Sequence, residues 1–373
     1  MLDKASSGTH VYQSLNANQA FAQAETALAE RRVSEAVDLY RIAEARGFDA
    51  DACSGARWVC HMLLGDFDSA WSEGERIDKR GRPDANRFWN RKPLRGKRVL
   101  IRCLHGLGDT LQFVRYAALL RKQVASLTIE TQPLVKRLVQ QSGLADHVIS
   151  WGETEPAWDQ QIEVVELPRI FRTTLETIPS SVPYLKGLPR DYARPGQQKL
   201  RVGLVWASSR YNPSRCVPLA NLSELCRTAG VEFYSFQAGD NRQELAGIDL
   251  PIQDAFDRSG CIQAAADGLA NMHLLITVDT MMAHLGGALG MPVWTLLPFQ
   301  ADWRWMLYRT DSPWYPTMRL FRQQADGEWE APISQLQTEL QRLASDSDSA
   351  MSRAAASGSE SFSSSGPGPG SVQ

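Results

Sequence analysis

The chain has 373 residues, of which 43% are hydrophobic, and its formal net charge is −2. This length suits about two domains at the usual ~100–200 residues each, and the near-neutral charge excludes a general attraction to nucleic acid or anionic membrane surfaces. The six cysteines form no Cys-x-x-Cys pair and no apolar run is long enough to span a bilayer, so we expect a cytoplasmic protein with reduced thiols and no transmembrane segment.

The N-terminal part is predicted to be helical. Residues 1–16 are expected to form a flexible N-terminus, and residues 17–92 carry a helical pattern in which the segment around Ala36 aligns with the segment around Ala70. The step of 34 residues is the period of tetratricopeptide helix pairs. The pattern therefore predicts a short tetratricopeptide-like cap that could also recruit a protein partner, with a plain helical hairpin as the alternative.

Two α/β domains are predicted after the cap. In residues 93–186, β-like runs alternate with helical ones, which is typical of right-handed βαβ units with a parallel sheet. The expected strands are 98–103, 126–130, 147–151 and 164–167, and the expected helices are 111–122 and 134–142. Residues 187–199 are rich in Pro, Gly and charge, and so predict an interdomain linker.

A second alternation predicts another Rossmann-type domain over residues 200–345. Its expected strands are 201–206, 231–236, 274–279, 292–297 and 318–321. Residues 346–373 are rich in Ser, Gly, Ala and Pro, which predicts a disordered tail. The fold class expected is therefore α/β, with a pair of Rossmann-type domains behind a short helical cap.

The turn that contains Gly106, Gly108 and Asp109 follows the first predicted strand and opens a helix. One interpretation is a dinucleotide fingerprint with Glu130 as the ribose-binding acid, but Leu111 stands where the third glycine should be. In another interpretation, Asp109 points into the crevice at the carboxyl edge of the sheet and acts as a general base. A third is that Asp109 merely caps the helix.

A similar turn follows the predicted strand 274–279 in the second domain. There Asp279 and Thr280 precede a helix whose free N–H groups suit a diphosphate, and His284 lies one helical turn further on. The run Gly286, Gly287 and Gly290 would be costly in an exposed helix, so something should pack closely against it. The alternative for His284 is a structural histidine in the core.

Four segments together resemble the tetratricopeptide-associated glycosyltransferases of the heptosyltransferase-like superfamily, which is similar to glycosyltransferase family 9. These segments are residues 98–116, 202–219, 233–239 and 277–322. The resemblance implies a GT-B fold, in which the acceptor binds the N-terminal domain and the nucleotide-sugar donor binds the C-terminal one. It implies that Asp109 is the catalytic base, and that Asp279, Thr280 and His284 hold the donor diphosphate.

The same resemblance implies further roles. Arg215 takes the place of a basic residue against phosphate, and Gln237 ends the strand of a donor-side element. The acceptor-side turn consists of Gly106, Gly108 and Thr110. The aromatic residues after strand 292–297 are expected either to line the cleft or to belong to the core: Trp303, Trp305, Trp314 and Tyr315.

The chain also departs from this superfamily. Met281 stands where heptosyltransferases have glycine, and Leu104 and His105 stand where relatives have an acid and an amide. The Asp-x-Asp matches at 49–51, 66–68 and 346–348 are expected to be caps and solvated loops rather than metal ligands. A reaction without metal or other cofactor is therefore expected, in which the helix dipole and Arg215 neutralise the leaving diphosphate.

The sequence thus predicts an inverting, metal-independent glycosyltransferase that transfers a hexosyl or heptosyl group from a nucleotide-diphosphate donor. The acceptor would be a hydroxyl of a glycan, a lipid-linked molecule or a protein. Domain closure across the linker is expected to exclude water. One alternative is a degenerate GT-B-fold protein that binds a nucleotide or a partner without turnover, which the substitutions at 104, 105 and 281 favour. Another is an NAD(P)-dependent oxidoreductase.

Overall fold

The computed structural model describes residues 12, 14–81, 87–188, 199–208, 212–257 and 259–359, with side chains as far as residue 346. Most of the predicted N-terminus of residues 1–16, positions 189–198 of the predicted linker and positions 360–373 of the predicted tail lie outside the described residues.

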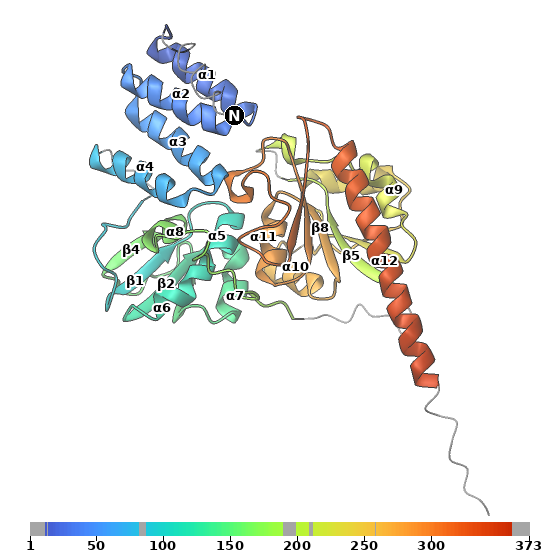
Figure 1. The fold of residues 1–373 in the computed structure, drawn as a ribbon. Coiled ribbons are helices and arrows are strands. Elements are labelled where there is room, and N and C mark those ends of the chain that lie inside the picture. The colour runs from blue at the N-terminus through green and yellow to red at the C-terminus, as the bar shows by residue number, and fades with distance from the viewer. Residues whose placement is uncertain are drawn as a thin grey trace, which may run out of the picture.

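The N-terminal cap consists of four helices that stack in chain order at one end of the molecule (Figure 1). Asn16 opens the first helix with a capping box, and the Asp49 and Asp66 side chains cap the third and fourth. Ala36 and Ala70, the repeat positions, are both fully buried. The helices are α1 (Ala17–Ala29), α2 (Val33–Ala45), α3 (Ala50–Leu64) and α4 (Phe67–Lys79).

The N-terminal α/β domain contains a four-stranded parallel sheet of order β3-β2-β1-β4. Its strands are β1 (Arg98–Arg102), β2 (Ser126–Thr131), β3 (His147–Ser150) and β4 (Gln160–Glu163). The helical elements are α5 (Leu107–Phe113), η1 (Val114–Tyr116), α6 (Ala117–Arg121), α7 (Pro133–Gln141), η2 (Val164–Glu166) and α8 (Leu167–Ile170).

Two predictions in this domain are wrong in detail. The strand expected at 164–167 lies at β4 instead, because the Glu163 and Glu166 side chains form a capping box that starts a helical turn at Val164. The helix expected at 111–122 begins four residues earlier and is divided by the 3-10 turn η1.

The C-terminal α/β domain contains a six-stranded parallel sheet of order β10-β9-β8-β5-β6-β7. Its strands are β5 (Leu200–Val205), β6 (Val231–Ser235), β7 (Ile252–Asp254), β8 (Leu274–Val278), β9 (Val293–Leu297) and β10 (Met318–Arg322). The helical elements are η3 (Pro213–Arg215), η4 (Leu219–Leu222), α9 (Ser223–Cys226), η5 (Asp240–Gly247), α10 (Ile262–Leu269), α11 (Met281–Ala288), η6 (Trp303–Trp305) and α12 (Glu330–Ser359).

The last helix corrects the predicted tail. Residues 346–359 continue α12, where the sequence predicted disorder, and the helix crosses the outer face of the C-terminal sheet (Figure 1). Its N-terminal half packs through Ile333, Leu336 and Leu340 on a core cluster shared with β5 and β8. The mixed α/β class with two parallel sheets is confirmed.

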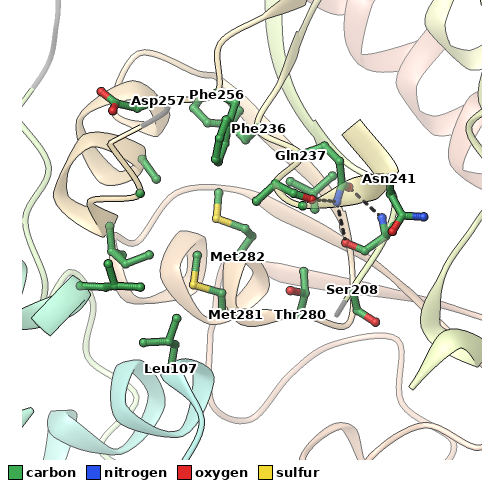
Figure 2. Close-up of a pocket in the computed structure, with 18 of the residues that line it drawn as sticks. Leu107, Ser208, Phe236, Gln237, Asn241, Phe256, Asp257, Thr280, Met281 and Met282 are labelled. Carbon is green, nitrogen blue, oxygen red and sulfur yellow. Dashed lines mark hydrogen bonds between the residues drawn. The ribbon is translucent and has the colours of Figure 1, made fainter. Parts of the chain in front are cut away.

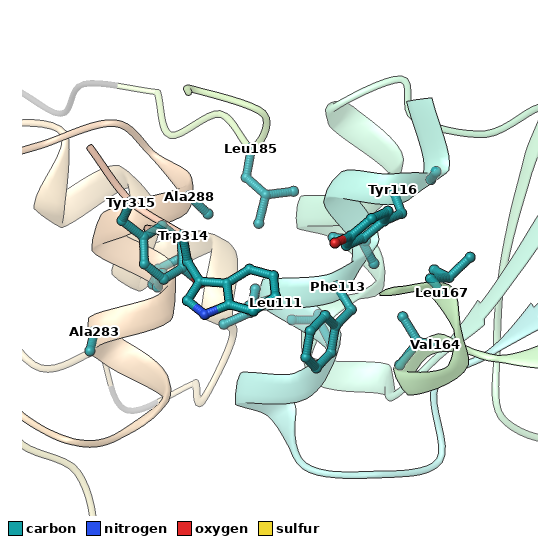
Figure 3. Close-up of a cluster of buried hydrophobic side chains, with 14 of the residues drawn as sticks. Leu111, Phe113, Tyr116, Val164, Leu167, Leu185, Ala283, Ala288, Trp314 and Tyr315 are labelled. Carbon is teal, nitrogen blue, oxygen red and sulfur yellow. The ribbon is translucent and has the colours of Figure 1, made fainter. Parts of the chain in front are cut away.

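One hydrophobic core joins the cap and both α/β domains. It contains Phe67 of the cap, Phe113 of the N-terminal domain and Trp314 of the C-terminal domain, and the rings of the last two make an edge-on contact at 5.9 Å. Figure 3 shows Trp314 and Tyr315 facing Phe113 and Tyr116 across the domain boundary. Because this interface is large and apolar, the two domains pack as one body rather than as lobes joined by a flexible hinge.

Candidate active site

A cleft lies where the carboxyl ends of both sheets meet. Its polar part is a cavity of about 610 Å³. The Gly106–Asp109 turn after β1 lines one side, and the residues after β5, β8 and β9 line the other. Ligands of open α/β sheets bind at this edge of the strands, so the geometry selects the cleft as the candidate site.

Asp109 lies in the first turn of α5 and links the two domains. Its Oδ2 accepts a hydrogen bond from Gly106 N at 3.0 Å, and its Oδ1 pairs with Arg304 from the C-terminal domain. Arg304 Nη1 also pairs with Asp302 at 2.8 Å, and its Nε donates to Gln112 Oε1 at 2.8 Å. Asp109 thus caps its helix as well as facing the cleft.

Asp279 and Arg215 form an ion pair in the wall of the cleft, in which Asp279 is buried and Arg215 is partly exposed. Asp279 is only 2% exposed, and this burial raises the pKa of its carboxyl to about 6 against the opposing effect of Arg215. Its Oδ2 lies 3.3 Å from Arg215 Nε but accepts no hydrogen bond among the described residues. Arg215 Nη2 also lies 3.7 Å from Asp302, so Arg215 sits between two carboxylates.

Thr280 is the N-cap residue of α11 and lines the cleft. The Thr280 side chain does not cap this helix, and within the described part of the chain the N–H groups of Met281 and Met282 have no hydrogen-bond partner. A helix N-terminus with unused N–H groups attracts an anion. The predicted position of Thr280 at the entrance of a helix is therefore correct.

His284 lies on the face of α11 that points toward the N-terminal domain. Burial, with Arg304 nearby, lowers the pKa of His284 to about 3, so the ring is neutral. It stacks on Trp305 at 5.3 Å, and its Nδ1 lies 2.9 Å from Tyr315 Oη. Burial keeps the pKa of Tyr315 well above its usual range, so we assign the phenol as donor to Nδ1. The ring hydrogen is then on Nε2, toward Gly108 and the cleft.

Gly108 allows α5 to approach α11, and two glycines within α11 allow that helix to pack closely on its own domain. A Cβ on Gly108 would lie 3.0 Å from His284 Cδ2. A Cβ on Gly287 would lie 2.3 Å from the Tyr315 ring, and one on Gly286 would lie 2.8 Å from Leu275 and from Val293. The expectation of close packing along this glycine run is confirmed.

Two predicted site residues have their polar atoms engaged in hydrogen bonds within the protein. Gln237 is 2% exposed, and its amide bonds only to backbone atoms: it accepts from Trp206 N and Ala207 N and donates to Ala207 O and Ala238 O. Thr110 is fully buried and donates to Gln132 Oε1 at 2.9 Å. The polar atoms of both side chains are therefore engaged within the protein, but Gln237 also lines an apolar cavity beside the cleft, whereas Thr110 lines neither.

The four aromatic residues belong to the core rather than to the cleft. Trp305, Trp314 and Tyr315 are fully buried. Trp303 is partly buried and lines a separate cavity beneath the cap, together with Trp58 and Trp71. Since none of the four lines either part of the cleft, the interpretation as cleft aromatics is wrong.

Sequence reasoning missed three charged residues near the site. Asp302 and Arg304 follow β9 at the same sheet edge as the predicted residues, but the tryptophans around them suggested only an aromatic run. Glu163 ends β4, is fully buried, and lies 2.6 Å from His105 Nδ1. Asp302 and Arg304 could have been found as charged residues that follow the predicted strand 292–297, whereas Glu163 stands before the predicted strand 164–167 and no such signal marked it.

An apolar cavity of about 470 Å³ continues the cleft and shares Thr280 and Met281 with the polar part. Figure 2 shows Leu107 of the N-terminal domain opposite Met281 and Met282, with Phe236 and Phe256 farther along. Met281 lines both the polar and the apolar part of the cleft and lies between them. This is the position at which the sequence departs from the glycine expected in heptosyltransferases. A flat apolar group fits beside these side chains.

The dinucleotide interpretation has no support in this geometry. Glu130, the predicted ribose-binding acid, pairs with Arg102 at 2.5 Å and lines neither part of the cleft. Among the described residues, no three His, Cys, Asp or Glu side chains are grouped as a metal site would require. No helix in the described part of the chain is long and apolar enough to cross a membrane.

Known proteins match this chain only at low identity. No family model matches it. Protein FlbA of Caulobacter vibrioides is 25% identical over 330 residues, which cover 78% of this chain and 55% of FlbA. The chain thus spans about half the length of that curated relative.

Solved structures similar to this one include a glycosyltransferase family 9 protein from Veillonella parvula. It is 13% identical, the match covers 68% of this chain and 99% of that chain, and the TM-score is 0.48. ADP-heptose LPS heptosyltransferase II of E. coli is 12% identical. The match covers 67% of this chain and 99% of that chain, with a TM-score of 0.48. The dodecameric iron-containing glycosyltransferase TibC from enterotoxigenic E. coli is 14% identical. The match covers 65% of this chain and 67% of that chain, with a TM-score of 0.46.

Proposed function

We propose that the chain is a GT-B-type glycosyltransferase that moves a sugar from a nucleotide-diphosphate donor to an acceptor hydroxyl. One observation carries the proposal: a carboxylate, Asp109, faces an uncapped helix N-terminus and an arginine, Arg215, across a cleft between two parallel sheets. Glycosyl transfer needs a base for the attacking hydroxyl and a site for the leaving anion, and these lie on opposite walls.

The donor would occupy the C-terminal side of the cleft. Its diphosphate would accept hydrogen bonds from the free N–H groups at the start of α11, and it would pair with Arg215. His284 Nε2–H would donate to a phosphate oxygen. The nucleoside would enter the apolar cavity beside Met281 and Met282. Asp279 would act beneath the site, where it orients Arg215, rather than by touching the diphosphate.

The acceptor would approach from the N-terminal domain. Asp109 is the carboxylate on this wall of the cleft, and it pairs with Arg304. Because base and leaving group lie on opposite walls, the hydroxyl would attack from the side opposite the diphosphate, which favours inversion. Chemistry by these residues needs no metal, and the acceptor would be a glycan, a lipid-linked molecule or a protein.

Donor binding can be tested by titration calorimetry with a panel of nucleoside diphosphates and nucleotide-sugars. We expect the wild-type chain to bind one of them and Arg215→Gln to bind it at least ~10-fold more weakly, because an arginine–phosphate pair is a strong, charge-assisted contact. Arg227→Gln, on the exposed side of α9, is the control and should bind as the wild type does. Equal affinity of all three proteins would contradict the proposal.

A second candidate is a nucleotide-binding protein without turnover. The observation in its favour is that both oxygens of Asp109 are engaged, one by Gly106 N and the other by Arg304. In such a protein the Asp109–Arg304 pair would serve only to hold the domains together. Donor binding without release of the nucleoside diphosphate, for every acceptor class tested, would favour this candidate.

A further inference from the structure

The loop between β9 and β10 carries two charged residues of the cleft on one side and contacts the helical cap on the other. We call residues 299–308 the bridge loop. Asp302 and Arg304 lie in it, and Arg304 reaches Asp109 of the N-terminal domain. The position of this loop therefore decides where the Arg304 guanidinium lies relative to the proposed base.

The cap holds the bridge loop by hydrogen bonds from two helix ends. Arg31, in the turn between α1 and α2, donates from Nε to Phe299 O and from Nη2 to Ala301 O, both at 2.8 Å. At the end of α3, Leu63 O accepts from Leu307 N at 2.9 Å. These contacts lie on both sides of Arg304 in the sequence, so the cap fixes the loop on either side of the cleft residue.

Ring packing adds a third contact. Trp58 of α3 meets Trp303 edge-on, with ring centroids 5.2 Å apart. Trp303 in turn lies under the Arg304 guanidinium, whose central carbon is 4.5 Å from the ring centroid. The cap therefore also contacts the ring that supports the guanidinium.

The backbone of the bridge loop needs outside support. Met306 has φ 53° and Tyr308 has φ 57°, values that side chains other than glycine rarely adopt. Such a conformation persists only where the surroundings hold it. Leu307, the residue between them, is the one bonded to the cap, and Met306 is buried in the shared core.

We infer that the helical cap is a positioning element of the cleft, and that Arg31 is a positioning residue that acts through the bridge loop on Arg304. In consequence, a change on the cap alters the Asp109–Arg304 pair without any contact to substrate. The inference deepens the proposed function and rests on it for the effect on transfer, whereas its effect on the loop does not depend on any activity.

The test is hydrogen exchange, followed by mass spectrometry, on the full chain and three variants. In Arg31→Ala we expect peptides that cover residues 299–308 to exchange at least ~10-fold faster, while α2, α3 and the C-terminal sheet keep the wild-type rates. Arg31→Lys, which keeps the charge but has a single donor nitrogen in place of Nε and Nη2, should fall between. Arg32→Ala is the matched control, because the neighbouring Arg32 pairs with Glu30 and Glu35 within the cap.

Transfer kinetics supply a second readout. Since Arg304 pairs with the proposed base, Arg31→Ala should lower kcat at least ~10-fold and change the donor KM less than ~2-fold. Equal exchange in Arg31→Ala and Arg32→Ala overturns the inference, and so does faster exchange spread evenly over the chain, which indicates general destabilisation. A wild-type chain without transfer activity contradicts the proposed function, while loop exchange still decides the role of the cap.

Discussion

His284 shows how burial sets the chemistry of a single side chain in this cleft. Its pKa of about 3 lies below the usual 6.5, so the unfolded chain binds a proton that the folded chain rejects at mildly acidic pH. The free energy of unfolding therefore decreases as the pH falls below 6.5, because only the unfolded chain gains the proton. A neutral ring can donate to phosphate only through Nε2, which is the role proposed here.

The variant His284→Gln should remove this pH dependence. Well below pH 6.5 each pH unit costs the wild type about 1.4 kcal/mol, and near pH 6.5 it costs less. The free energy of unfolding should therefore fall by about 2 kcal/mol more in the wild type than in the variant between pH 6.5 and 4.5. Urea denaturation at the two pH values measures the difference. If both proteins lose the same stability, His284 is not a buried neutral group.

Asp279 gives a second prediction at this scale, because its pKa of about 6 lies close to neutral pH. A diphosphate near Arg215 would draw the arginine away from Asp279 and raise the pKa of that carboxyl further, so donor binding should take up a proton near pH 6.5. Calorimetry in two buffers of different ionisation enthalpy measures this uptake. Asp279→Asn should show none, and an equal uptake in the variant would contradict the assignment.

The sequence predicted the positions of the site residues better than their roles. Asp109, Thr280 and His284 follow strands in the expected places, because a strand followed by a helix fixes where such residues emerge. Gln237 looked like a donor-side residue, and three of its four hydrogen bonds to backbone atoms are with Trp206 and Ala207, which follow β5. The sequence around Gln237 carries no information about these contacts, because Trp206 and Ala207 lie about 30 residues earlier in the chain.

Helix α11 is the element on which the site depends most. Its N-terminus faces the cleft, while Gly286 and Gly287 press against β8, β9 and Tyr315. The lack of side chains at these positions lets Tyr315 reach His284 Nδ1. The packing of α11 and the orientation of the His284 ring are therefore coupled.

A glycine pair tests this coupling. Gly287→Ala places a Cβ 2.3 Å from the Tyr315 ring, which cannot move within a filled core, so we expect a loss of at least ~2 kcal/mol of stability. Gly55→Ala in α3 is the control, because its Cβ meets nothing within 4 Å. Removing a helical glycine there should stabilise the chain by about 0.5–1 kcal/mol. Thermal denaturation compares them, and equal shifts would contradict the packing argument.

Most strands were predictable at the scale of elements, because parallel strands buried on both faces form continuous apolar runs. The exceptions have identifiable causes. Residues 164–167 are apolar, but the Glu163–Glu166 capping box turns them into a helical turn. The edge strand β7 is short and exposed, with no apolar run to mark it. Residues 346–359 extend α12 despite their small-residue composition.

The molecule as a whole is held by contacts between its three parts. Arg115 is 3% exposed and lies over the Tyr315 ring, with its guanidinium carbon 4.5 Å from the centroid, while its Nη2 donates to Tyr184. Tyr184 N bonds to Ala288 O at 3.0 Å, and a Cβ on Gly187 would lie 2.3 Å from Ala266 O. Domain closure across the linker, which the sequence suggested, would have to rearrange this interface.

We therefore expect the cap and both α/β domains to unfold together. Since one core passes through all three, scanning calorimetry of the full chain should show a single transition, and Trp314→Ala should lower its midpoint without dividing it. Two well-separated transitions in the wild-type chain would indicate independent domains. The expectation that the two α/β domains close on the substrate would then stand again.

Release of nucleoside diphosphate by the wild type and by Asp109→Asn tests the central claim most directly. With the donor that calorimetry identifies and a panel of glycan, lipid-linked and protein acceptors, we predict acceptor-dependent release by the wild type. The variant should bind the donor equally well but turn over at least ~100-fold more slowly, because general-base catalysis contributes ~10²–10⁴-fold. Asp38→Asn, on the exposed face of α2, should match the wild type. Full turnover by Asp109→Asn would contradict the account.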